Sequence, residues 1–232
     1  WHGEKRLEDA EALLRRATQI TPQFSGAWQT LGALLMEMNK YLDAITAYTK
    51  ATELEEKNAD AWAGLGNAHA RAMNPEEAAR AFERSIAIDG DAPGILSAYG
   101  WELKTLGNQA EALKAYRRAI KVRPRYGPAY WNMANLKIFK FENKEIETML
   151  EQVKREDLSE NEDIHFRFSL GKAMEDKKDY DQAWHFYHTG NQQQRMTVEY
   201  EMVEFENRLN AIKNVFNATL LTDRSDIGYE AP

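Results

Sequence analysis

An internal repeat of 34 residues constrains this chain more than any other feature of its sequence. A small residue recurs at this spacing, at Ala10, Ala44, Ala78 and Ala112. A large residue follows each alanine four positions later, at Leu14, Tyr48, Phe82 and Tyr116. A chain that repeats at such a period folds as a linear stack of similar units, not around one central core.

Each unit contains two helical patterns. The first has the form W-x-x-L-G, as at Trp28, and the second has the form A-x-x-x-[YF]-x-x-A, as at Ala44. Apolar residues three and four positions apart predict amphipathic helices, and the short polar turn between the two patterns predicts an antiparallel pair. Glycine destabilises a helix by about 1 kcal/mol relative to alanine. Its recurrence within the first pattern, at Gly32, Gly66 and Gly100, therefore predicts close packing of the two helices.

These residues resemble the tetratricopeptide repeat. The resemblance implies an all-α fold, a right-handed α-solenoid of tetratricopeptide helix pairs with a concave and a convex face. Counting along the chain predicts a partial repeat at 1–24, full repeats at 25–58, 59–92 and 93–126, a divergent repeat at 127–158, a repeat with an extended second helix at 159–197, a capping helix at 198–218 and a linker at 219–232. Ser159 and Glu162 form a capping-box pattern, which predicts a helix start after a shift of three residues in the register.

The C-terminal half contains segments that are more distinctive than a generic tetratricopeptide repeat. The segments Tyr130-Trp131-Asn132-Met133-Ala134 and Phe168-Ser169-Leu170-Gly171-Lys172 resemble the repeat region of bacterial tetratricopeptide-repeat sulfotransferases. That resemblance implies a following domain that uses 3′-phosphoadenosine 5′-phosphosulfate (PAPS). The P-R-S-G-T-[ST] loop by which that family binds the phosphosulfate does not occur in residues 1–232. We therefore expect the catalytic domain to be absent from this chain, and we assign no catalytic or cofactor-binding residue to it.

Composition excludes several further functions. The chain has no cysteine, which excludes disulfides, thiol nucleophiles and cysteine-ligated metal sites. A net charge of −7 argues against general nucleic-acid binding.

Asp181, His185 and His188 share a helix face at metal-ligand spacing, but they lie in the second helix of a repeat, so we predict no metal site. No apolar run approaches the ~20 residues of a membrane helix. The absence of cysteine fits a reducing cytoplasm, so the sequence predicts a cytoplasmic protein.

The first helices of such repeats line the concave face and form a candidate peptide groove. Trp101 stands out because the repeat does not require an aromatic residue there, although packing against Trp131 or the next repeat would also explain it. The candidate groove residues are Gln29, Asn67, Arg71, Trp101, Lys104, Trp131, Asn135 and Lys172, with Ala33, Met36, Ala63, Ser97, Ile138 and Phe168 beside them. The groove lacks the regular lysine–asparagine series by which chaperone-binding tetratricopeptide domains hold a C-terminal carboxylate.

A second candidate surface follows from the charge distribution. Between Glu111 and Glu142 there are eight basic residues and no acidic one. Four of them occupy outward positions on one second helix and form a candidate basic patch, Lys114, Arg117, Arg118 and Lys121. This patch is either a solvated convex face or a docking site for an acidic partner.

The sequence as a whole indicates an interaction scaffold without enzymatic activity of its own. In the first interpretation it is the N-terminal part of a PAPS-dependent sulfotransferase and recruits the acceptor substrate to the sulfotransferase domain. In the alternative it is a stand-alone adaptor that binds a peptide segment in its concave groove, and a third hypothesis is self-association. The expected partners are a protein or peptide, which can be the acceptor substrate, and the chain's own sulfotransferase domain, with no nucleic acid and no membrane.

Overall fold

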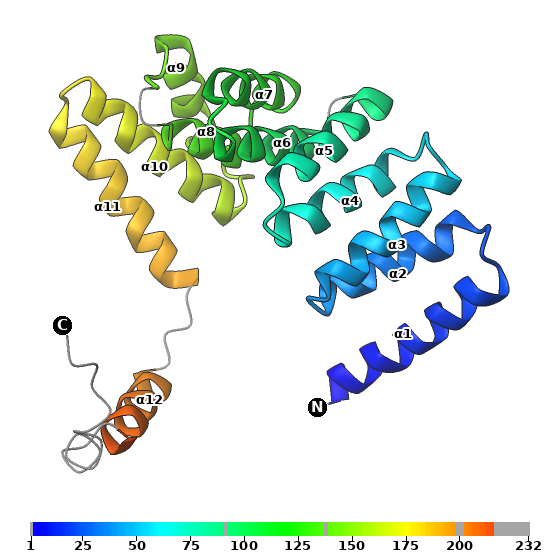
Figure 1. Cartoon of the computed structure of the whole chain (residues 1–232). Helices are drawn as coiled ribbons and strands as arrows, with labels where there is room; N and C mark the ends of the chain where they lie inside the picture. Colours follow the sequence, from blue (N-terminus) through cyan, green and yellow to red (C-terminus); the bar gives the residue numbers. More distant parts are fainter. Residues whose placement is uncertain (1, 91, 137–138, 198–201, 216–232) are drawn as a thin grey trace, which may run out of the picture. The chain divides into compact units, whose positions relative to one another are not determined.

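The computed structural model describes residues 2–90, 92–136, 139–197 and 202–215 of the chain (Figure 1). Contacts divide the chain into two compact units, residues 1–191 and residues 192–232, and each is described by itself. Lys137 of the basic segment, Ile138 of the expected groove and the expected linker 219–232 lie outside the described residues.

Within the described residues the chain forms twelve α-helices and no strand, which confirms the expected all-α fold. The helices are α1 (His2–Ile20), α2 (Ser25–Glu37), α3 (Tyr41–Leu54), α4 (Ala59–Arg71), α5 (Pro75–Asp89), α6 (Pro93–Thr105), α7 (Gln109–Val122), α8 (Gly127–Ala134), α9 (Asn143–Gln152), α10 (Glu160–Asp176), α11 (Tyr180–Thr197) and α12 (Met202–Val215).

Helices α2 to α7 pack as three pairs, α2 with α3, α4 with α5 and α6 with α7, and each pair packs on the next (Figure 1). The turn inside each pair repeats in its backbone conformation. Asn39, Met73 and Gly107 stand 34 residues apart in these turns, and their φ angles are 58°, 62° and 83°. A left-handed residue at the end of a helix reverses the chain direction. The same turn geometry therefore produces the same antiparallel pairing in all three repeats.

A glycine of the first helix lies against an aromatic ring of the second helix in four repeats. The partners are sixteen positions apart, at Gly32 and Tyr48, Gly66 and Phe82, Gly100 and Tyr116, and Gly171 and Tyr187. A Cβ atom at these glycines would lie only 2.5–2.9 Å from the ring. In the divergent repeat the two positions hold Ala134 and Leu150, so an alanine occurs where the ring is replaced by a smaller side chain. The recurring glycine thus makes room for the ring.

The divergent repeat departs from the expected pair of helices of about a dozen residues each. Helix α8 ends at Ala134, and α9 begins only at Asn143. In the described part of the intervening segment, Leu136, Phe139 and Phe141 are buried. The two phenylalanine rings meet edge to face, with 4.8 Å between their centroids. Burial of these apolar side chains stabilises the non-helical segment at the expense of a longer helix.

Helices α8 and α10 pack closely on each other, beside the short α9. A Cβ atom at Gly127 would lie 2.8 Å from the backbone oxygen of Glu162, so the starts of the two helices nearly touch. The rings of Tyr130 and Phe166 lie 5.2 Å apart in the same contact. The capping box predicted from Ser159 and Glu162 is confirmed at the start of α10.

The second unit contains the end of α11 and helix α12. In α12 the side chains of Leu209, Ile212 and Val215 are exposed. Residues 198–201 and 216–218 of the expected capping helix lie outside the described residues. Its function as a cap stays a prediction.

Candidate protein-interaction surface

The first helices of the repeats form one face of the stack. Helix α2 contacts α4, α4 contacts α6, and α6 contacts α8, whereas the second helices of neighbouring repeats make fewer contacts among the described residues. A stack that is tighter along one row of helices curves toward that row. The first helices therefore line the inner surface, where the sequence placed the candidate groove.

One position of the repeat runs as a row across this inner surface. It is the residue directly after the glycine or alanine that faces the second helix, at Ala33, Asn67, Trp101, Asn135 and Lys172. The first four side chains are exposed and Lys172 is half-buried. Trp101 lies at the centre of the row.

Trp101 is 47% exposed, which is unusual for so large an apolar side chain. The ammonium of Lys104, one helical turn later, lies 4.6 Å from the centroid of its ring. Other tryptophans of the repeat have structural contacts: Trp28 and Trp62 each donate a hydrogen bond of 2.9 Å from Nε1 to a backbone carbonyl six residues earlier. Among the described residues, Trp101 makes no such bond and no ring stacking contact.

Trp131 has a different environment from Trp101. Its ring packs against the next first helix, 5.4 Å from Phe168 and 6.4 Å from His165 between ring centroids. Burial lowers the pKa of His165. Packing against the next repeat, one of the alternatives for the two tryptophans, therefore describes Trp131 and not Trp101.

The remaining groove candidates differ in how far they are already engaged. Gln29 accepts a hydrogen bond from Asn58, and Lys172 forms an ion pair with Asp176. Asn135 donates through Nδ2 to the backbone oxygen of Trp131.

Arg71 is also engaged. It donates to the hydroxyl of Tyr41 at 2.8 Å and lies over the Tyr41 ring. Asn67 makes no side-chain hydrogen bond within the described part of the chain. Trp101, Lys104, Asn67 and the carbonyl group of Asn135 are thus the groups of the inner surface best able to receive a partner.

The candidate basic patch on α7 is partly neutralised by neighbouring carboxylates. Arg117 donates through Nε to Glu145 at 2.9 Å and forms an ion pair with Glu142 at 2.6 Å, both in the next repeat. Lys114 pairs with Glu111 on its own helix at 2.7 Å, and Arg118 has an interaction partner as well. Arg117 is therefore a contact between repeats, and its reversal would disturb the fold as well as any binding.

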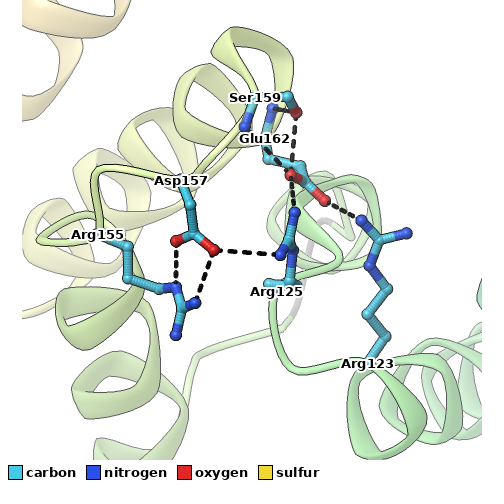
Figure 2. Close-up of polar contacts among 6 residues, drawn as sticks. All are labelled: Arg123, Arg125, Arg155, Asp157, Ser159 and Glu162. Atoms are coloured by element: carbon cyan, nitrogen blue, oxygen red, sulfur yellow. Dashed lines mark hydrogen bonds and ion pairs between the residues drawn. The ribbon is translucent and has the colours of Figure 1, made fainter.

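Two further arginines of the basic segment, Arg123 and Arg125, pair with acidic residues that follow them in sequence (Figure 2). Glu162, at the start of α10, pairs with Arg123 at 2.6 Å and with Arg125 at 3.7 Å. Arg125 also reaches Asp157, whose pKa is lowered by its hydrogen bond from Arg155. The side chain of Glu162 is only 9% exposed. The pairs that Arg123 and Arg125 form with Glu162 therefore join the α7–α8 turn to the start of α10.

A groove on the outer side is a feature that sequence reasoning missed. It lies between α3 and α5, has a volume of about 600 Å³, and is lined by Trp62, His69, Glu77 and Arg84 among others. His69 stands where the neighbouring repeats have the buried residues Leu35 and Leu103. Its Nδ1 atom is buried without a hydrogen-bond partner in the described part of the chain. Comparing residues at the 34-residue spacing would have found this substitution.

We expect His69→Leu to stabilise the protein most at acidic pH. Burial lowers the pKa of His69, while Glu77 raises it and Arg80 lowers it. The folded state therefore favours neutral imidazole, and its contribution is lost as the pH falls below the ordinary value of 6.5. One proton corresponds to a slope of at most ~1.4 kcal/mol per pH unit. Urea unfolding of wild type and variant at pH 7 and pH 5.5 measures the difference.

His69→Gln separates titration from packing in this experiment. Glutamine does not titrate, but it also lacks the apolar side chain of the leucine that the neighbouring repeats have at this position. It should flatten the pH dependence as His69→Leu does, without the same gain at pH 7. An unchanged pH dependence in both variants would contradict the assignment to His69.

No group of three or more histidine, aspartate or glutamate side chains is arranged to hold a metal ion in the part of the chain that the structure describes. Of Asp181, His185 and His188, for which the sequence predicts no metal site, His188 stacks on Trp184 with 5.6 Å between ring centroids. None of the described helices is both long and apolar enough to cross a membrane.

Comparison with known proteins identifies the repeat. Two family models match the chain, and both are described as tetratricopeptide repeat, over residues 30–93 and 94–126. Among curated proteins, human "Protein O-mannosyl-transferase TMTC3" is 33% identical over 181 residues. The match covers 76% of this chain and 16% of that protein, so the chain spans about one sixth of this relative's length.

Solved structures with the same fold include a crystal structure of MamA, with a TM-score of 0.55 and 18% identity, covering 86% of this chain and 95% of that one. They also include YrrB, which is described as a TPR (tetratricopeptide repeat) protein with an unusual peptide-binding site. Its TM-score is 0.59 and its identity 18%, and the match covers 78% of this chain and 92% of that one. At this identity the likeness shows the fold alone. The chain therefore contains tetratricopeptide repeats and folds as an α-solenoid of their helix pairs.

Proposed function

We propose that this chain is a protein-interaction scaffold that binds an extended peptide segment along the concave surface formed by α2, α4, α6, α8 and α10. The observation that carries the proposal is Trp101, which is 47% exposed at the centre of that surface and has Lys104 stacked on it. Exposed tryptophans without a structural contact are frequent hot spots of protein interfaces. The description of YrrB as a peptide-binding protein is consistent with such use of the fold.

The same surface supports a more specific proposal, in which the repeats recruit an acceptor substrate to an attached transferase domain. The resemblance of residues 127–232 to tetratricopeptide-repeat sulfotransferases favours a PAPS-dependent sulfotransferase domain. The human relative, by its name a protein O-mannosyl-transferase, supports the pairing of such repeats with a transferase. A P-R-S-G-T-[ST] loop in the coding sequence shortly after Pro232 would support this proposal. A stop codon there would refute it and leave the stand-alone adaptor.

Selection of peptides from a random dodecapeptide phage library tests the concave site. We expect Trp101→Ala in the whole chain to weaken the selected peptides by tenfold or more, because truncating an interface hot spot costs about 2 kcal/mol or more. Fluorescence anisotropy with labelled synthetic peptides measures the dissociation constants. The selection supports the proposal only if the bound peptides depend on Trp101.

Charge reversal on α7 serves as the matched control. Lys114→Glu and Lys121→Glu remove charge from the exposed part of the basic patch and spare Arg117, which links two repeats. They should leave the dissociation constants within about twofold. If these variants lose binding and Trp101→Ala keeps it, the convex basic patch is the site and the concave proposal fails.

A further inference from the structure

We propose that the concave surface selects peptide segments in which an acidic side chain lies beside a large apolar one, with Lys104 binding the carboxylate and Trp101 packing against the apolar group. This inference rests on the proposed function, since it names the chemistry of the peptide that occupies the same surface. It assigns the recognition to a pair of side chains on α6.

Lys104 differs from the other cations of the candidate groove. Lys172 forms an ion pair with Asp176, and Arg71 donates to the hydroxyl of Tyr41. Within the described residues the side chain of Lys104 has neither an ion pair nor a hydrogen bond, and its ammonium lies over the Trp101 ring. A cation without a carboxylate, held at a fixed place on an exposed apolar ring, is complementary to a negatively charged group beside an apolar one.

The carboxylate and the ring do not compete for Lys104. An ammonium has three donors, so it can bind a carboxylate and remain over the indole. A charge-assisted hydrogen bond is stronger than an exposed cation–π contact. The indole also partly excludes water from the ammonium, which strengthens its interaction with an acidic group.

The neighbouring repeats indicate an extended peptide that continues on both sides of Trp101. Asn67 on α4 and Asn135 on α8 occupy the same repeat position as Trp101 on α6. Packed helices lie about 8–10 Å apart, which corresponds to roughly three residues of an extended chain at ~3.3 Å each. The free amide groups of Asn67 and the carbonyl of Asn135 can therefore bind the peptide backbone about three residues before and after the residue on Trp101.

This arrangement favours an internal acidic side chain over a free C-terminus. A terminal carboxylate ends the chain at Lys104, so only one of the two flanking asparagines could contact the peptide. A single cation also provides less neutralisation than the several donors that usually hold a terminal carboxylate. We therefore assign the partner to the class of extended internal segments with Asp or Glu next to a large apolar residue.

The test uses the peptides selected on the whole chain from the dodecapeptide library. We expect the selected sequences to be enriched in Asp or Glu within two positions of an aromatic or large aliphatic residue. Lys104→Gln should then weaken each peptide about tenfold or more, as should replacing the peptide's acidic residue by its amide. The matched control Lys50→Gln, which removes a cation of α3 that is already paired with Glu53 and lies outside the candidate groove, should change affinity less than threefold.

The outcomes separate this inference from the proposed function. If Trp101→Ala abolishes binding and Lys104→Gln leaves it unchanged, the concave site stands and the acidic preference is wrong. If both variants bind as wild type does, or if no peptide is selected, both proposals are wrong. If amidated and free C-terminal forms of the peptides differ more than the internal acid and its amide, the carboxylate is a chain terminus, and the inference is overturned.

Discussion

The variant Gly100→Ala should lower the free energy of unfolding by about 1–3 kcal/mol, although alanine is the better helix former by about 1 kcal/mol. The added methyl group would lie 2.5 Å from Cε1 of Tyr116, and Tyr116 is fully buried, so the ring has no free space to move into. The control is Gly94→Ala on the same helix, where the nearest atom is the Tyr126 hydroxyl at 3.7 Å. This control should be neutral or slightly stabilising.

The divergent repeat suggests how to rescue this variant. Its alanine and leucine, Ala134 and Leu150, occupy the two positions of Gly100 and Tyr116. Tyr116→Leu alone should cost about 2–3 kcal/mol for the cavity it leaves. The double variant should be no less stable than Tyr116→Leu, which gives a coupling energy of about 1–3 kcal/mol. Additive losses in the double variant would show that the steric contact does not explain the glycine.

Repeat proteins need not unfold in a single step, so the readout should be local as well as global. Urea unfolding followed by circular dichroism gives the global value. Hydrogen exchange of α6 and α7 shows whether the loss is concentrated in the repeat that carries Gly100→Ala.

The second large effect is expected from Glu162→Gln, which should destabilise the start of α10 by about 1–2 kcal/mol. The substitution keeps the capping box, because glutamine also serves there, and it removes the charge that pairs with Arg123 and Arg125. Breaking a fully buried pair costs about 3–5 kcal/mol. The two arginines are 46% and 38% exposed, so solvent screening reduces the expected loss.

Glu142→Gln is the matched control for this prediction. Glu142 also pairs with an arginine from the preceding repeat, but its side chain is 66% exposed. Its replacement should change stability by less than about 0.5 kcal/mol. Hydrogen exchange measures the local loss, in the first turns of α8 and α10 for Glu162→Gln and in the first turn of α9 for Glu142→Gln. Equal effects of the two substitutions would show that burial of Glu162 does not decide the strength of its ion pairs.

The parts of the fold that could be predicted from sequence depend on local patterns. The 34-residue spacing of small and large residues predicted the helix pairs, because side chains three and four positions apart share a helix face. Ser159 and Glu162 predicted the start of α10, because the capping box lies within four residues. The shortening of α8 could not be predicted in this way, because burial of Leu136, Phe139 and Phe141 outweighs the repeat pattern there.

The candidate surfaces also have features that the sequence predicts and features that it does not. The sequence by itself determined that first helices would share one face and that Trp101 and Lys104 would lie one turn apart on it, because helical periodicity fixes both. Only the tertiary structure decided that Trp131 packs on the next repeat while Trp101 stays exposed, and that Arg117, Arg123 and Arg125 meet their carboxylates. These carboxylates lie 25–39 residues away in sequence. Ion pairs depend on distance in space, so three arginines of a segment that is strongly basic in sequence pair with carboxylates of the following repeats once the helices stack.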